Sequence, residues 1–337
     1  MNYIPQDESV FVSVIIPTRN MRELLRRTIE SLIHQSYPET SFEIIVVDNS
    51  STDGTGEMVR SVQEKTSHNL RYYSKENEGP GAARNLGITK AKGSIIAFTD
   101  SDCVADSEWL RNGVAGMTDE VGLVQGKTLP NPKQPQRIVQ HTMKVISENS
   151  FYPTCNIFYK KDALESVGGF SSEFCGLNVF GRQRGGEDTD LAWRIKESGW
   201  KSIFADDAVI YHHVFILTSL RAVIKYTRFN VLFALALNIK KHPALRDAIL
   251  YRRIFKSKQR ALFYLFVLSL IFGIISHWGF FFLGVPYVAR LLRVSFHNRP
   301  LWSYHRGITL FCIIIIIELV ESVLSISASL LHRTIIL

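Results

Sequence analysis

The first two thirds of the chain are predicted to form an α/β domain with a doubly wound, mainly parallel sheet, followed by an α-helical membrane-associated region. Runs rich in β-branched residues alternate with stretches of helical periodicity, and each run ends in polar residues, which is typical of such sheets. The balance of charged residues also changes at the boundary between these two regions. Residues 1–215 carry 23 Lys and Arg against 28 Asp and Glu, whereas residues 216–337 carry 16 against 3.

Four apolar runs are expected to be strands of the sheet. They are VSVIIP (12–17), EIIVVD (43–48), LRYYS (70–74) and SIIAFTD (94–100). Ligands of doubly wound sheets bind beyond the carboxyl ends of the strands. The acidic residues Asp48, Asp100 and Asp102 are all expected at that edge.

Two helices are expected between these strands. In the first, Asn20 followed by Glu23 forms a capping pattern, and apolar residues then recur at helical spacing from Leu25 until Pro38 closes the segment. The second spans about residues 81–91.

The cysteines and the N-terminus favour a cytoplasmic location for this domain. The four cysteines (Cys103, Cys155, Cys175 and Cys312) show no CxxC spacing, so reduced thiols are expected. The N-terminal MNYIPQDESV lacks a basic region followed by an apolar one, so no signal peptide is predicted.

The C-terminal third is expected to associate with a cell membrane. Residues 216–260 are basic; over 218–241, apolar positions alternate with Arg and Lys at helical spacing, which fits either an amphipathic helix on a bilayer or an ordinary surface helix. Two apolar segments follow within 261–337, at about 261–289 and 308–331, and each is long enough to enter a bilayer. Basic residues interleaved with apolar runs fit an anionic membrane surface better than nucleic acid.

Two membrane topologies are compatible with these segments. Basic residues lie on both sides of 261–289, so the positive-inside tendency places both ends of this segment on one side. Two simple spans would place the connection at 290–307 outside. A kinked or re-entrant hairpin at 261–289, broken near Gly273, Gly279 and Pro286, would keep this connection inside. Glu318 and Glu321 share one helical face and are costly in lipid, so they are expected to face protein or to lie near an interface.

Four local patterns carry candidate chemistry. Asp100 and Asp102 directly follow a buried strand, where carboxylates suit Mg²⁺ or Mn²⁺ shared with substrate phosphates. Gly186-Glu187-Asp188-Thr189-Asp190 opens a helix with more carboxylates than capping requires, so one is a candidate general base. His212-His213 ends a strand and offers an additional metal ligand. Gly79-Pro80-Gly81 opens a helix whose free N–H groups and Arg84 could meet a diphosphate.

Taken in order, several motifs resemble the family 2 glycosyltransferases of the GT-A fold over about residues 10–215. The motifs are VSVIIPTRN, EIIVVDNSSTDGT, NEGPGAARNLGITKAKGSIIAFTDSDC, VGGF and GGEDTDLAWRIKESG. Members of this family are typically inverting enzymes that use a nucleotide-diphosphate sugar and a divalent metal. The Gln-x-x-Arg-Trp motif of processive polysaccharide synthases is absent from this sequence, which favours transfer of one sugar at a time.

The resemblance implies roles for individual residues. It implies that Asp188 is the catalytic base with Glu187 beside it, that Asp102 is the direct metal ligand, and that His212 or His213 is a further one. It also implies a nucleotide-sugar site, in which Asp48 recognises the base and Asp100 contacts the ribose. The residues of that site are Pro17, Thr18, Arg19, Asn20, Asp48, Asp53, Arg84 and Asp100.

The function expected from these observations is that of a membrane-anchored hexosyltransferase. It would transfer one sugar to a lipid-linked or cell-envelope glycan acceptor at the membrane. A UDP-sugar is the first donor to consider, and Mn²⁺ or Mg²⁺ is the expected cofactor. The catalytic domain would lie on the cytoplasmic side. The alternative is a non-catalytic nucleotide-sugar-binding scaffold of an envelope-glycan assembly complex, which would tolerate changes at Asp188.

Overall fold

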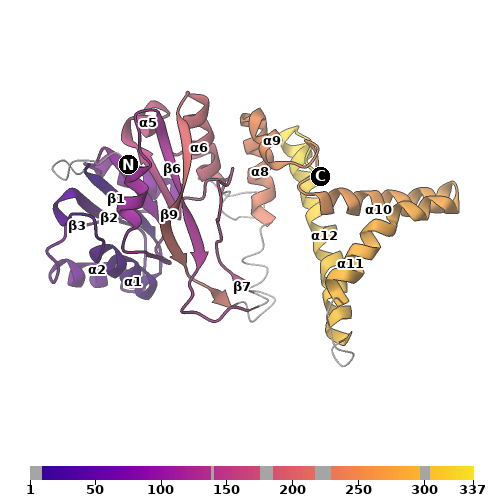
Figure 1. Cartoon of the computed structure of the whole chain (residues 1–337), viewed down its shortest axis with the longest axis horizontal. Coiled ribbons are helices and arrows are strands. Elements are labelled where there is room, and N and C mark those ends of the chain that lie inside the picture. Colours follow the sequence, from indigo (N-terminus) through magenta and orange to yellow (C-terminus); the bar gives the residue numbers. More distant parts are fainter. Residues whose placement is uncertain (1–9, 138–139, 175–184, 217–228, 297–303) are drawn as a thin grey trace. The chain divides into compact units, whose positions relative to one another are not determined.

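The structure of the chain is a computed structural model, which describes residues 10–137, 140–174, 185–216, 229–296 and 304–337. The chain divides into two compact units, one ending at Thr227 and the other beginning at Arg228 (Figure 1).

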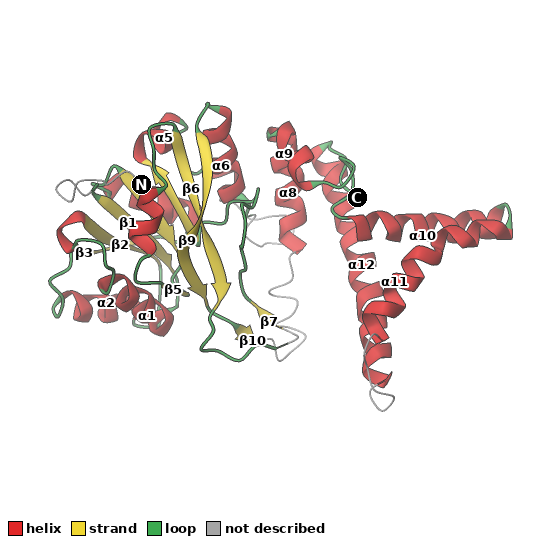
Figure 2. Cartoon of the chain, in the orientation of Figure 1, coloured by secondary structure: helices red, strands yellow, loops and turns green. Residues whose placement is uncertain are grey.

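The first unit is built on an eight-stranded mixed sheet, in the order β3-β2-β1-β4-β8-β6-β9-β5 (Figure 2). Strands β1 to β4 pair in parallel and alternate with helices, whereas β8 is antiparallel to both of its neighbours. Beyond β8, β6 pairs in parallel with β9, and β5 pairs antiparallel to β9. The strands are β1 (Val12–Thr18), β2 (Phe42–Asn49), β3 (Leu70–Lys75), β4 (Ile95–Thr99), β5 (Cys103–Ala105), β6 (Val121–Pro130), β8 (Asn156–Lys160) and β9 (Lys201–His212).

Alternate residues of the central strands pack into two separate layers. On β1, Val14 and Ile16 join the core cluster that contains Leu25 and Trp109, from helices on one face. On the other face Ile15 lies against Gly87, where an added Cβ would come within 2.5 Å of it. Burial on both faces explains why the strands read as continuous apolar runs. The helices are α1 (Arg22–Ile33), α2 (Thr55–Gln63), α3 (Pro80–Lys90), α4 (Trp109–Ala115), α5 (Lys161–Ser166) and α6 (Glu187–Glu197).

The predicted strands and the doubly wound α/β sheet are confirmed, but the predicted cap of the first helix is wrong. Helix α1 begins at Arg22 after Met21, and Asn20 lies outside it with φ 52°. The Asn20 side chain instead accepts a hydrogen bond from Thr52 N at 2.7 Å. Asp53, distant in sequence, accepts from the N–H of Arg22 at 3.0 Å. A tertiary contact therefore replaces the local cap.

A small two-stranded sheet pairs β7 (Gln140–His141) with β10 (Phe215–Ile216). Residues 217–228, which include the first half of the basic segment expected to be amphipathic, lie outside the described residues.

The second unit is helical. It contains α8 (Phe229–Lys241), α9 (Pro243–Ile249), α10 (Lys258–Ile275), η3 (Trp278–Gly284), α11 (Val285–Phe296) and α12 (Tyr304–His332). Three stretches, Lys258–Ile275, Trp278–Phe296 and Ile314–His332, are long and apolar enough to cross a membrane. Their outward side chains are mostly apolar; Ile274 and Ile275, for example, are each 78% exposed. Such surfaces are unfavourable in water, which fits the expected membrane association.

The first apolar segment of the sequence covers parts of three elements in the structure, α10, η3 and α11. The chain reverses after α10, at Ser276 and His277, and η3 then packs back along α10 through Gly273, whose added Cβ would meet Phe281 at 2.7 Å. This reversal corresponds to the hairpin that the sequence left open as an alternative. The chain breaks between Gly273 and Gly279, whereas Pro286 lies within the first turn of α11. Glu318 and Glu321 face protein, where both pair with Arg260.

Candidate active site

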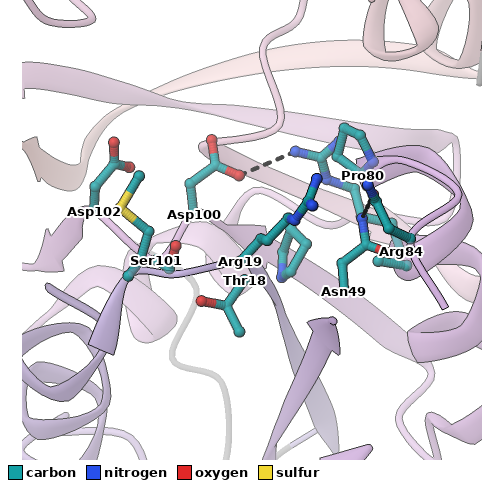
Figure 3. Close-up of a pocket in the computed structure, with 12 residues that line it drawn as sticks. Thr18, Arg19, Asn49, Pro80, Arg84, Asp100, Ser101 and Asp102 are labelled. Atoms are coloured by element: carbon teal, nitrogen blue, oxygen red, sulfur yellow. Dashed lines mark hydrogen bonds and ion pairs between the residues drawn. The ribbon is translucent and has the colours of Figure 1, made fainter. Parts of the chain in front are cut away.

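A cavity of about 300 Å³ lies at the carboxyl ends of β1, β2 and β4. Because β1 is parallel to both β2 and β4, their ends meet at one edge of the sheet, with Thr18 level with Asp48. Figure 3 shows Asp100 and Asp102 side by side after β4, with Arg84 reaching toward Asp100. The lining residues are Pro17, Thr18, Arg19, Met21, Asn49, Asn77, Pro80, Ala83, Arg84, Asp100, Ser101 and Asp102.

Most of the residues expected in the nucleotide-sugar site line this cavity, but three do not. Asp48 is buried and fully engaged, because its carboxylate accepts hydrogen bonds from Ser51 N at 2.9 Å and from the Tyr72 hydroxyl at 2.7 Å. Burial and the Asp48 carboxylate together raise the pKa of Tyr72. Asn20 and Asp53 fix the loop after β2 through the contacts described above. Asp48 is buried and Asn20 and Asp53 are exposed, and all three stabilise the loop that follows β2.

Two asparagines outside the predicted site residues, Asn49 and Asn77, line the cavity. The Asn49 side chain donates to Asn77 Oδ1 at 2.8 Å and accepts from Glu78 N at 3.3 Å. Amide side chains can both donate and accept, which suits recognition of a nucleobase edge. Asn49 directly follows Asp48 at the end of a strand, so its position in the sequence could have indicated a place in the site. Asn77 lies in a loop, where no sequence pattern indicates such a place.

Arg84 on α3 joins two motifs that lie about a hundred residues apart in the sequence. Its guanidinium is 3.0 Å from Asp100 Oδ1, 3.5 Å from Glu187 Oε1 and 3.7 Å from Asp188 Oδ1, and its side chain is only 6% exposed. Burial opposes the charged form, but the three carboxylates outweigh it and raise the pKa of Arg84. A permanent positive charge beside the cavity can stabilise a diphosphate.

The loop after α5 holds Arg84 in place. Asn85, its neighbour, donates to Phe170 O and accepts from Phe170 N, both at 2.8 Å. The Phe170 ring then packs against the Arg84 guanidinium, 5.6 Å from ring centroid to Cζ. Gly169 needs its φ of 70° and leaves no room for a Cβ beside Asn85, so the VGGF motif has a structural reason.

Of the three carboxylates that open α6, that of Asp188 is the most exposed. One of its oxygens accepts hydrogen bonds from the N–H and hydroxyl of Thr154, both at 3.1 Å. The Asp188 side chain remains 25% exposed, whereas that of Glu187 is 7% exposed. Asp190 is fully buried and pairs with Arg194 at 2.7 Å, so it stabilises the helix.

Burial raises the pKa of Asp188, and Arg84 opposes that rise. Burial also raises the pKa of Glu187, to about 7, with Asp188 adding to the rise and Arg84 opposing it. Neighbouring carboxylates with raised pKa values are typical of acid–base sites.

Replacement of Glu187 by Gln is expected to reduce the pH dependence of stability. The pKa of Glu187 is about 7 in the folded chain against an ordinary value of 4.5, so folding binds a proton between these pH values. The contribution of Glu187 to stability is therefore largest below about pH 4.5 and falls as the pH rises to 7, by up to about 3 kcal/mol. Thermal unfolding of the full chain in detergent at pH 5 and pH 8 measures this fall. Glu187→Gln should melt at more similar temperatures at the two pH values than the wild type; equal differences would contradict the prediction.

A second constellation lies beside Asp102. Ligand atoms of Asp102, Cys103 and His212 lie within 4.8 Å of one another, and His212 Nε2 is 3.7 Å from Asp102 Oδ2. The other ring nitrogen of His212, Nδ1, donates to the carbonyl oxygen of His213 at 2.8 Å. In the neutral ring Nε2 therefore carries the lone pair toward Asp102, the orientation of a metal-binding histidine.

His213 is turned away from this constellation. Its ring contacts the Gln134 amide at 2.9 Å and packs edge-on against Phe215. The structure therefore brings the side chains of Asp102 and His212 together. His213 reaches Asp102 only through its backbone N–H, which donates to the Asp102 carbonyl oxygen at 2.9 Å, and its ring lies elsewhere.

The residues around Asp102 fit a hard divalent cation. A carboxylate and one imidazole suit Mn²⁺ well, and two protein ligands leave coordination positions for phosphate oxygens. Burial raises the pKa of Cys103 well above its ordinary value, and the Cys103 thiol faces Asp102 Oδ1 at 3.8 Å. The donor set therefore favours Mn²⁺ or Mg²⁺ over a thiophilic metal.

The sequence of the first unit is similar to known proteins. Residues 13–180 match the family model of Glycosyl transferase family 2. Glycosyltransferase AglE of Haloferax volcanii is 33% identical over 211 residues, which cover 60% of this chain and 66% of AglE. Poly(ribitol-phosphate) beta-N-acetylglucosaminyltransferase TarS of Staphylococcus aureus is 32% identical over 133 residues, which cover 39% of this chain and 23% of TarS. The chain thus spans less than two thirds of either relative.

Solved structures share its fold. Mannosyltransferase PcManGT from Pyrobaculum calidifontis, in complex with GDP-Man and Mn²⁺, matches 98% of this chain and 90% of its own with a TM-score of 0.54 at 19% identity. Residues 1–349 of S. aureus TarS, in complex with UDP-GlcNAc, match 89% of this chain and 79% of their own with a TM-score of 0.52 at 20% identity. The predicted GT-A fold is therefore confirmed.

Proposed function

The chain belongs to family 2 of the glycosyltransferases, and on this premise we propose that it moves one sugar from a nucleotide-diphosphate sugar to an acceptor hydroxyl with inversion at the anomeric carbon. The observation that carries the proposal is the position of Asp188. Its carboxylate is held by Thr154, partly exposed, and 3.7 Å from an arginine that lines the cavity.

The proposed reaction is a direct displacement. Asp188 takes the proton of the acceptor hydroxyl as the hydroxyl oxygen forms a bond to the anomeric carbon. The bond between that carbon and the phosphate oxygen breaks on the opposite side, and the nucleotide diphosphate leaves with the bonding electrons. Arg84 lies where it can hold the diphosphate, and Asn49 and Asn77 where they can contact the base.

Asp102 and His212 are the residues proposed to hold a divalent ion. When bound, such an ion would supply positive charge that stabilises the leaving diphosphate. Mn²⁺ is the ion to test first, because the pair includes an imidazole nitrogen.

The acceptor is proposed to be membrane-borne, such as a lipid-linked saccharide. Support comes from the three apolar stretches found among the described residues of the second unit, which could hold the chain in a cell membrane. The catalytic unit is proposed to lie on the cytoplasmic side. The basic character of residues 216–337 favours contact with anionic headgroups.

A panel of donors tests the proposal. Thermal unfolding of the full chain in detergent is measured with UDP-, GDP- and dTDP-sugars, with and without Mn²⁺. Because a ligand that prefers the folded state raises stability, one class of donor should raise the melting temperature, and Mn²⁺ should increase that shift. A UDP-sugar is the expected donor. A panel in which no nucleotide sugar stabilises the chain would speak against the proposal.

A further inference from the structure

A second cavity, of about 290 Å³, lies within the helical unit. Its walls come from the start of α10, the middle of α11 and the middle of α12. The lining residues are Lys256, Ser257, Gln259, Arg260, Arg290, Ile314, Glu318 and Glu321.

The charged groups of this cavity do not balance. Three cationic side chains, Lys256, Arg260 and Arg290, face two carboxylates, Glu318 and Glu321. The ionised set therefore carries one net positive charge among apolar helices. An uncompensated charge in such surroundings is costly, and one bound anion would neutralise it.

Arg260 is already committed to the protein. Its guanidinium is 6% exposed, donates to the carbonyl oxygen of Glu318 at 2.7 Å and to Ser322 Oγ at 3.2 Å, and pairs with Glu321. These contacts tie the start of α10 to α12. Arg260 is therefore a structural residue of the cavity.

Arg290, in contrast, has donors to spare. Its guanidinium lies 3.8 Å from Glu318 Oε1, longer than a hydrogen bond, and makes no hydrogen bond within the described part of the chain. Among the described residues, the Lys256 ammonium makes one hydrogen bond, to Glu321 at 3.2 Å, and the Gln259 side-chain amide makes none. A guanidinium fork next to an ammonium and an amide suits the oxygens of a phosphate group.

The surroundings of the cavity indicate where such a phosphate comes from. Helices α10 and α11 expose large apolar side chains, such as Leu268 at 48%, Ile271 at 45% and Leu292 at 46%. A ligand whose phosphate lies in the cavity and whose apolar chains lie along these helices would satisfy both surfaces. A membrane phospholipid has this composition.

We propose that this cavity binds the phosphate of a membrane lipid headgroup, with Arg290 as the main contact and Lys256 and Gln259 beside it. The proposal rests on the membrane insertion proposed above for the second unit. It requires no sugar transfer, so it can be tested apart from catalysis.

The test uses the full chain in dodecyl maltoside and follows thermal unfolding. Dioleoyl phosphatidic acid is titrated into the micelles, dioleoylglycerol serves as the same lipid without phosphate, and inorganic phosphate serves as the same anion without a lipid. Phosphatidic acid is expected to raise the melting temperature, and the other two to have little effect. Equal stabilisation by dioleoylglycerol would overturn the proposal, and equal stabilisation by inorganic phosphate would overturn its assignment to a lipid.

Two arginines of α11 provide matched variants. Arg290→Gln is expected to weaken the apparent affinity for phosphatidic acid about tenfold or more, because a charge-assisted contact is lost. Arg293→Gln removes the same charge at an exposed position outside the cavity and should change the affinity less than about twofold. Arg290→Lys keeps the charge but loses the guanidinium fork, and should lie between them. Equal losses in Arg290→Gln and Arg293→Gln would show a general charge effect and overturn the proposal.

Flotation with neutral phosphatidylcholine vesicles separates the two proposals. If the wild-type chain does not float, the proposed membrane insertion fails. If the wild type and Arg290→Gln float alike and only the variant loses its response to phosphatidic acid, the lipid-phosphate site is supported.

Discussion

Asp188→Asn is expected to lower the rate of sugar transfer by about 10²–10⁴-fold, because a general base typically contributes that much. Asparagine keeps the shape of the side chain and can still accept hydrogen bonds from Thr154, so the chain should remain folded. The fall should lie in kcat, because the acceptor proton is removed only during reaction. Initial rates at saturating donor and acceptor measure it, and the melting temperature checks the fold.

Asp162→Asn is the matched control for this variant. Asp162 also lies in the first turn of a helix, α5, and is exposed, so its replacement removes the same charge outside the site. This control should transfer sugar at the wild-type rate. Undiminished turnover in Asp188→Asn would refute the assignment of the base. If the wild-type chain binds the donor but transfers no sugar, the scaffold function would be favoured instead.

Asp102→Ala is expected to lower transfer by about 10³-fold, since charge stabilisation of a leaving group by a bound metal is worth several kcal/mol. Binding provides a second measurement that does not depend on activity. In calorimetric titrations with UDP, Mn²⁺ should increase the affinity of the wild type and have little effect on Asp102→Ala.

The adjacent histidines test the geometry of this site. His212→Ala should weaken the effect of Mn²⁺ on UDP affinity, because its Nε2 faces Asp102. His213→Ala removes the same ring one residue later, where it contacts Gln134, and should leave the effect unchanged. If both variants behave alike, or if Asp102→Ala binds UDP and Mn²⁺ as the wild type does, the proposed metal site is wrong.

The sequence alone predicted the central sheet and the edge at which the cavity lies. Strands β1, β2 and β4 are buried on both faces, so each appears as an apolar run that ends in polar residues. Parallel strands bring those ends together, which placed Asp100 and Asp102 at one edge. The ordered motifs then identified the family, because each motif is a short run of contiguous residues that can be recognised in the sequence.

Contacts between distant residues could not be predicted in this way. The pairing of Arg84 with Glu187 and Asp188, the support of Asp188 by Thr154, and the amide pair of Asn49 and Asn77 each join segments that lie far apart in the sequence. The same applies to the cap of α1, where Asp53 takes the role expected of Asn20. Local patterns carry no information on which loop side chains meet.

The sequence by itself therefore determined the fold class, the family and the carboxylates at the strand ends, because strand burial and short motifs are properties of contiguous residues. Only the tertiary structure distinguished His212 from His213, divided the first apolar segment into α10 and a returning η3–α11, and gathered Arg260, Arg290 and Glu318 around one cavity. Those outcomes depend on side-chain direction and on packing between segments far apart in the chain, which periodicity and charge do not encode.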